Sequence, residues 1–197
     1  WIRQMIHGFS AGLQERADLA MLAVQGPEAI ANTKSILSPA QCDALETLTP
    51  FECVEVDDWF FARTGYTGED GLEIIVPAKD IASLWRMLLQ QGVTPCGLAA
   101  RDTLRLEAGL LLYGQDMDET TTPLESGLGW TVKWEPADRD FIGMGALLSQ
   151  KSQGINRKLV GLTLLDKGIM RAGHQVVTAD GKEGIITSGI YSPTLEQ

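Results

Sequence analysis

The 197-residue sequence has few of the side chains that build metal or redox sites: it contains three cysteines and two histidines. Cys42, Cys53 and Cys96 are widely spaced and form no CxxC pair, so neither a zinc site nor a disulfide framework is indicated. His7 and His174 lie far apart in the sequence. We therefore expect reduced thiols in a cytoplasmic compartment and no metal site.

Positive charge is also scarce, because 16 Lys and Arg residues face 26 Asp and Glu residues, a formal net charge of −10. An acidic chain repels phosphate backbones, so no nucleic-acid partner is expected. No apolar run approaches the roughly 20 residues of a membrane span, and no signal peptide is visible, so no membrane association is expected. GxSxG and Cys–His nucleophile motifs are lacking too. Both ends look cut, which predicts a fragment of a longer protein.

What is present is a mixture of helical and strand patterns, which predicts an α+β fold with an antiparallel sheet. Ser38 and Pro39 are expected to begin a helix, and Gly92 and Gly109 to end two others. Asp57–Asp58 has the composition of a hairpin turn. Strands are expected at residues 20–24, 51–56, 59–63 and 72–76, and helices at residues 27–36, 38–48, 78–92 and 97–109.

From Lys158 onward the sequence changes to alternating apolar residues with many glycines, and Asp180–Gly181 is a strong hairpin signal. This texture predicts the start of an all-β domain, preceded by a polar linker at residues 149–158.

The stretch RTGYTGEDGLEIIVP places Glu73 inside an apolar strand. Leu72, Ile74 and Val76 share one face, and Glu73 and Ile75 share the other, as in a strand covered on both sides. A buried carboxylate needs a partner, so Glu73 either reaches water at an edge or faces a pocket with hydrogen-bond donors. The preceding glycines, spaced GxxGxxG before a strand, predict a tight turn and close backbone approach, not a nucleotide loop.

The stretch GLAARDTLRLEAG places Arg101 and Arg105 one turn apart on a helix that is expected to be largely buried. They either pair structurally with Asp102, Glu107 or a neighbour, or they serve a pocket beside Glu73.

Further along, Trp130 and Trp134 are candidate flat surfaces for a ring, although core packing is the commoner use of tryptophan. Asp116, Asp118 and Glu119 lack the EF-hand pattern of a calcium site.

Four ordered stretches resemble the T-protein of the glycine cleavage system, the aminomethyltransferase family, and they look closest to bacterial members. They are TGYTGEDGLEI, GLAARDTLRLEAGLLLYGQDMDETTTPLE, GWTVKWEPADRDFIG and EGIITSGIYSPTL. The resemblance implies a central tetrahydrofolate pocket in a three-domain protein. This chain would then hold the end of a first domain, a central α+β domain and the start of a C-terminal β-barrel, at residues 1–48, 49–150 and 156–197. It also implies transfer of a methylene group to tetrahydrofolate from the aminomethyl-lipoyl arm of the H-protein, with release of ammonia, in glycine catabolism and one-carbon metabolism.

Four positions carry over from that resemblance as folate-binding residues. Glu73 would hydrogen-bond the pterin, Arg101 would contact folate, and Trp130 and Phe51 would form aromatic or apolar walls. The family's catalytic aspartate is expected upstream of this chain, so no catalytic residue is assigned and the fragment is expected to be inactive.

Two other functions stay open at this stage. One is a folate-binding regulatory or assembly module without carbon transfer, and the upstream aspartate would discriminate it from the enzyme. The other is an acidic interaction domain without a ligand, which Glu73 and Arg101 argue against.

Overall fold

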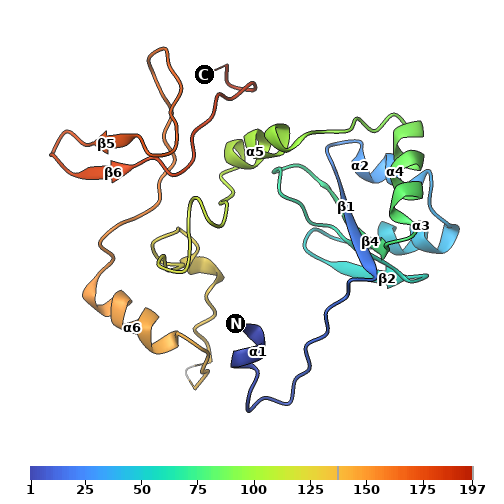
Figure 1. Cartoon of the computed structure of the whole chain (residues 1–197), viewed down its shortest axis with the longest axis horizontal. Helices are drawn as coiled ribbons and strands as arrows, with labels where there is room; N and C mark the ends of the chain where they lie inside the picture. Colours follow the sequence, from blue (N-terminus) through green and yellow to red (C-terminus); the bar gives the residue numbers. More distant parts are fainter. Residues whose placement is uncertain (137, 197) are drawn as a thin grey trace. The chain divides into compact units, whose positions relative to one another are not determined.

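The computed structural model describes residues 1–136 and 138–196. Ala137, inside the GWTVKWEPADRDFIG motif, and Gln197, at the end of the expected barrel segment, lie outside the described residues. The chain forms two compact units, Trp1–Gly97 and Leu98–Gln197 (Figure 1). Helices combine with antiparallel strands, which confirms the predicted α+β class. Among the described residues, no helix combines the length and the apolar character needed to cross a membrane.

The first unit is built on a four-stranded antiparallel sheet in the order β1-β4-β3-β2. The strands are β1 (Leu19–Gln25), β2 (Cys53–Val56), β3 (Trp59–Ala62) and β4 (Gly71–Pro77). β1 pairs with β4 over its whole length, so segments on both sides of residue 48 share one sheet. The predicted boundary between domains at residue 48 stays a prediction.

One face of this sheet forms the core, and the helices lie on that side (Figure 1). The helices are α2 (Ala29–Lys34), α3 (Pro39–Glu46) and α4 (Ile81–Gln90), after a short α1 (Ile2–Met5). Phe61, Ile74 and Val76 of the sheet are completely buried, as is Leu84 of α4. Burying an aliphatic or aromatic side chain of this size contributes about 1.5–3 kcal/mol, so this face carries most of the stability of the unit.

Local signals set several boundaries as predicted. Ser38 caps α3, its hydroxyl accepting from the Gln41 backbone N–H, while the Gln41 side chain accepts from the Ser38 N–H. Asp57 and Asp58 both adopt positive φ, 54° and 62°, between β2 and β3, the backbone pattern of a two-residue hairpin turn.

The prediction that β4 is covered on both faces is wrong for this chain. Leu72, Ile74 and Val76 are buried, whereas Glu73 and Ile75 on the other face are only half-buried. All the helices that cover the sheet pack on the first face, so the second face is open. The carboxylate of Glu73 therefore stands on an accessible surface.

The second unit contains α5 (Leu98–Glu107), a short 3-10 helix η1 (Gly129–Thr131), α6 (Met144–Gln153), β5 (Gln175–Val177) and β6 (Glu183–Ile185). β5 and β6 form the predicted hairpin around Gly181, whose φ is +79°. The predicted linker at residues 149–158 is partly wrong, because α6 continues to Gln153. Gly143 and Gly154, with φ of 95° and 93°, bound that helix.

The predicted burial of the helix at residues 97–109 is also wrong. Leu98 is 80 % exposed and Arg101 is exposed, while Arg105 is the buried member of α5. The leucines of this helix thus do not face a core within the described chain.

Candidate functional site

Glu73 lies in the middle of β4, an interior strand of the sheet, and its side chain projects from the open face. Its neighbours in register are Ala23 on β1 and Ala62 on β3. Two methyl side chains leave space on both sides of the carboxylate. A flat group could therefore approach Glu73 edge-on without displacing a neighbouring side chain.

The carboxylate is held in place by Thr64, whose hydroxyl donates to Oε2 of Glu73 over 2.6 Å. A hydrogen bond to an ionised acceptor is short and strong, so it fixes the orientation of the carboxylate plane. Thr64 stands in the loop between β3 and β4, and sequence reasoning did not find it. The only signal is its place directly before Gly65 in the RTGYTGEDG stretch.

The loop that carries Thr64 is fixed at both ends by Arg63 and Asp70. The Arg63 guanidinium donates to both carboxylate oxygens of Asp70, over 2.9 and 2.6 Å, and to the Leu48 carbonyl over 2.7 Å. The Gly26 N–H donates to the Asp70 carbonyl over 2.8 Å. The bidentate pair closes the loop into a rigid turn. The hydrogen bonds from Arg63 also lower the pKa of Asp70.

The glycines of this loop provide the close approach and the positive φ that the sequence predicts. The Gln25 amide donates to the Thr64 carbonyl over 3.0 Å, directly beneath the loop. A Cβ at Gly65 would overlap that amide, and a Cβ at Gly71 would overlap the Val24 carbonyl oxygen. Gly68 has a φ of +81°. Thr64 is thus placed by a loop whose backbone lies directly on Gln25.

Phe51 is joined to the same region through its backbone, since its N–H donates to the Arg63 carbonyl over 2.9 Å. It occupies the third position of a turn that begins at Thr49, with Pro50 second and Glu52 donating back to the Thr49 carbonyl. Its φ is 70°, where type II turns normally place glycine. The ring is 90 % exposed, so a strained backbone presents an aromatic side chain to solvent.

The other two predicted residues belong to the second unit. Arg101 is an exposed residue of α5, and Trp130 in η1 is 83 % exposed, which rules out core packing for this tryptophan within the described chain. Trp134 instead contacts Phe141 at a ring-centroid distance of 6.4 Å. Glu73, Thr64 and Phe51 are connected in the first unit, while a shared pocket with Arg101 and Trp130 stays a prediction.

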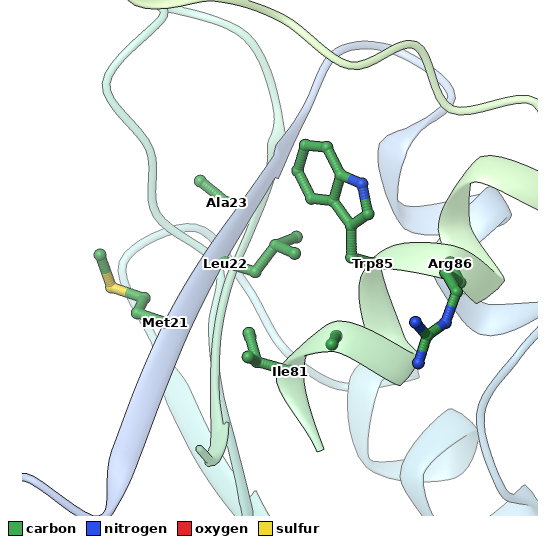
Figure 2. Close-up of a pocket in the computed structure, with 7 residues that line it drawn as sticks. Met21, Leu22, Ala23, Ile81, Trp85 and Arg86 are labelled. Atoms are coloured by element: carbon green, nitrogen blue, oxygen red, sulfur yellow. The ribbon is translucent and has the colours of Figure 1, made fainter. Parts of the chain in front are cut away.

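An apolar groove of about 550 Å³ lies between the edge strand β1 and helix α4. Figure 2 shows Leu22 facing Ile81 and Trp85 across it, while Met21 lies on the other side of β1. None of the predicted site residues lines this groove. The candidate site is therefore the open sheet face at Glu73, one strand away from the groove.

The chain belongs to the glycine cleavage T-protein family. The sequence model of the GCVT N-terminal domain matches residues 1–136, and that of the glycine cleavage T-protein C-terminal barrel domain matches residues 157–197. The first match covers more than half of the chain. The resemblance deduced from the sequence motifs is thereby confirmed.

Similar proteins carry the name aminomethyltransferase. The chain is 75 % identical over 197 residues to that of Legionella pneumophila (strain Corby), covering 100 % of this chain and 55 % of the relative. It is 54 % identical over 196 residues to that of Chromobacterium violaceum, covering 100 % of this chain and 54 % of the relative. The chain thus spans about half the length of the curated relatives it matches.

A solved structure is similar as well. The glycine cleavage system aminomethyltransferase T of Bartonella henselae matches with a TM-score of 0.86 and 34 % sequence identity. The match covers 99 % of this chain and 54 % of that one.

Proposed function

We propose that the full-length protein is an aminomethyltransferase of the glycine cleavage system. It would transfer a methylene group from the aminomethyl-lipoyl arm of the H-protein to tetrahydrofolate, with release of ammonia, in the cytoplasm. The observation that carries the proposal is the carboxylate of Glu73, which Thr64 holds on an open sheet face between two alanines. Membership of the T-protein family supports it.

The residues of this site fit a folate. A carboxylate with space on both sides suits the amino-pyrimidinone edge of a pterin, which offers paired donors to its two oxygens. In the first unit, exposed Phe51 offers a flat apolar surface. We propose that Trp130 and Arg101 of the second unit supply a further apolar surface and a cation to the same ligand. When bound, tetrahydrofolate supplies the nitrogens that accept the methylene group.

The role of these residues is to bind and orient. Glu73, fixed by Thr64, would determine how the pterin ring is rotated within its own plane. The aromatic side chains would determine the orientation of that plane. Holding two reactants in a productive geometry lowers the barrier without a nucleophile from the protein. We assign no catalytic residue in this chain, since the resemblance places the acid–base aspartate upstream of it.

The direct test is tetrahydrofolate binding by the full-length protein, measured by isothermal titration calorimetry. Glu73→Ala is expected to weaken binding by about 1–3 kcal/mol, the cost of leaving buried donors without an acceptor. Glu55→Gln is a matched control, because Glu55 lies exposed on the same open face, on β2. A folded Glu73→Ala protein with unchanged affinity would overturn the proposed site.

Arg101 is tested in the same way. Arg101→Ala is expected to weaken binding by a similar amount, about 1–3 kcal/mol. Arg86→Ala, another exposed helical arginine, should leave affinity unchanged. If Arg101→Ala and Arg86→Ala both bind tetrahydrofolate as tightly as the wild type, the role proposed for Arg101 is wrong.

Transfer discriminates the enzyme from a folate-binding regulatory or assembly module. The full-length protein is incubated with tetrahydrofolate and H-protein carrying the aminomethyl-lipoyl arm, and released ammonia is measured. Ammonia release that depends on tetrahydrofolate supports the aminomethyltransferase. Binding without release would favour the regulatory module.

A further inference from the structure

Arg105 on α5 is buried, although its neighbours on that helix are largely exposed. Its side chain is 1 % exposed, and its guanidinium donates to four groups. The acceptors are Asp102 Oδ1 at 2.8 Å, Asp116 Oδ2 at 2.5 Å, the Leu110 carbonyl at 3.1 Å and Ser188 Oγ at 2.8 Å. A buried guanidinium with this many acceptors holds a single orientation.

Asp116 is the second centre of the network, and its side chain is 5 % exposed. Besides Arg105 it accepts from the Leu112 N–H over 2.9 Å and from the Thr187 hydroxyl over 2.6 Å. Burial alone would raise the pKa of Asp116, but its polar neighbours, Ser188 and Thr187 first among them, hold it below its ordinary value. Asp116 therefore stays ionised opposite Arg105.

Further bonds join the same two segments. Gln115 donates to the Thr187 carbonyl and to Ser188 Oγ, both over 3.0 Å. At the end of α5, the Glu107 carboxylate accepts from the hydroxyls of Ser192 and Thr194, over 2.5 and 2.8 Å. All these residues lie within the second compact unit.

The partners come from two different family domains. Arg105 and Asp116 lie in the part that matches the GCVT N-terminal domain, whereas Thr187 and Ser188 lie in the part that matches the C-terminal barrel domain. Hydrogen bonds that span 71 to 87 residues of sequence thus join these two domains within this unit.

We propose that Arg105 and Asp116, with Thr187 and Ser188, form a latch that holds the C-terminal barrel domain against α5 and thereby positions Arg101. Arg101 lies one helical turn before Arg105, on the same side of the helix. A helix whose buried arginine is fixed to two flanking segments cannot rotate freely about its axis. Arg105 and Asp116 are therefore positioning residues, and the positioning of Arg101 for folate rests on the proposed function.

The latch itself is tested without folate, by hydrogen exchange of the full-length protein. Thr187→Val removes the hydroxyl bond to Asp116 at nearly constant volume, and Thr187→Ser retains the hydroxyl. Thr187→Val and Asp116→Asn are expected to speed backbone exchange at residues 186–195, and Thr187→Ser to leave it unchanged. Unchanged exchange in both Thr187→Val and Asp116→Asn would overturn the latch. Lys182→Ala, which breaks an exposed ion pair with Asp180, is the control.

The positioning of Arg101 is tested by a double-mutant cycle on the dissociation constant for tetrahydrofolate. Asp116→Asn alone is expected to weaken binding at least about fivefold, whereas in the Arg101→Ala background it should add little. Fully additive effects would show that Asp116 acts by a route other than Arg101. If Arg101→Ala alone changes nothing while exchange at residues 186–195 rises in Asp116→Asn, the folate role of Arg101 fails and the latch stands.

Discussion

Thr64 and Glu73 are joined by a hydrogen bond of 2.6 Å from the threonine hydroxyl to Oε2 of the carboxylate. The bond links a loop to the strand that follows it and turns one oxygen of Glu73 toward the protein. Sheet register and the two flanking alanines leave the rest of the carboxylate accessible on the open face. The geometry of the candidate site therefore depends on a residue that itself need not touch the ligand.

Replacing Thr64 tests this dependence. Thr64→Val keeps the side-chain shape but removes the hydroxyl, so the carboxylate loses its fixed orientation. We expect tetrahydrofolate binding to weaken by about 0.5–1.5 kcal/mol, the typical net value of one hydrogen bond. Thr64→Ser should restore binding in calorimetric titration. Equal affinities for the valine and serine variants would contradict the orienting role.

Gly65 of the same loop and Gly71, the first residue of β4, should respond differently to an added methyl group. At Gly71 a Cβ would meet the Val24 carbonyl oxygen, a backbone atom within the β1–β4 ladder. At Gly65 it would meet the Gln25 side-chain amide, which can swing away if it gives up its hydrogen bonds.

Gly71→Ala is therefore expected to lower the free energy of unfolding by about 1–3 kcal/mol, and Gly65→Ala by less. Urea denaturation measures both. Gly12→Ala, where no atom lies within 4 Å of the added Cβ, is the control. A larger loss at Gly65 than at Gly71 would mean that the Gln25 amide is the more rigid of the two obstacles.

Features that depend on neighbouring residues could be predicted from the sequence. The capping box at Ser38, the turn at Asp57–Asp58 and the end of α4 near Gly92 all follow from the local preferences of a few side chains. Glycine spacing also predicted the close backbone approach in the loop before β4. For the cap, the turn and the helix end, the interactions that decide the structure lie within about six residues of sequence. The close approach of the glycines has a distant partner, Gln25, which their spacing did not identify.

Features that depend on distant partners could not be predicted. The choice of Arg105 over Arg101 as the buried arginine follows from acceptors at Asp116 and Ser188, the latter 83 residues away. The second face of β4 is open because the helices cover only the first face of the sheet. The alternation of residues along β4 does not show which face the helices cover. Met144, Leu147 and Leu148 have helical spacing, but the polar residues after them favoured the interpretation as a linker.

The stability of the second unit should depend on pH through Glu125. The Thr122 backbone N–H and the Arg157 guanidinium donate to its two carboxylate oxygens, both over 2.9 Å. These bonds, led by the one from Thr122, outweigh the effect of burial and lower the pKa of Glu125 from its ordinary value of 4.5 to about 2. The Glu125 side chain is 13 % exposed.

A depressed folded-state pKa contributes stability above the unfolded pKa, and the contribution disappears as the pH falls through the folded pKa. The stabilisation by Glu125, up to about 3 kcal/mol, should therefore be complete above about pH 5 and lost between about pH 4.5 and pH 2. Thermal unfolding of the wild type and of Glu125→Gln measures this stabilisation, and the difference between their melting temperatures should narrow as the pH falls through that range. A difference in melting temperature that does not depend on pH would show that the carboxylate charge is not responsible.

Phe51 should show a conflict between stability and binding. Its φ of 70° is costly for a side chain with a Cβ and natural for glycine, and its ring is 90 % exposed, so removing the ring forfeits little packing. Phe51→Gly is therefore expected to keep or raise the melting temperature of the full-length protein, although glycine also increases the entropy of the unfolded chain.

The same variant should weaken tetrahydrofolate binding if the strained turn exists to present an aromatic wall, by about 1–3 kcal/mol for a lost stacking surface. Phe51→Tyr retains a ring at the same backbone position and should bind nearly as wild type. Calorimetry and thermal unfolding on the three proteins separate the two effects. Unchanged affinity in Phe51→Gly would show that Phe51 is not part of the proposed folate site.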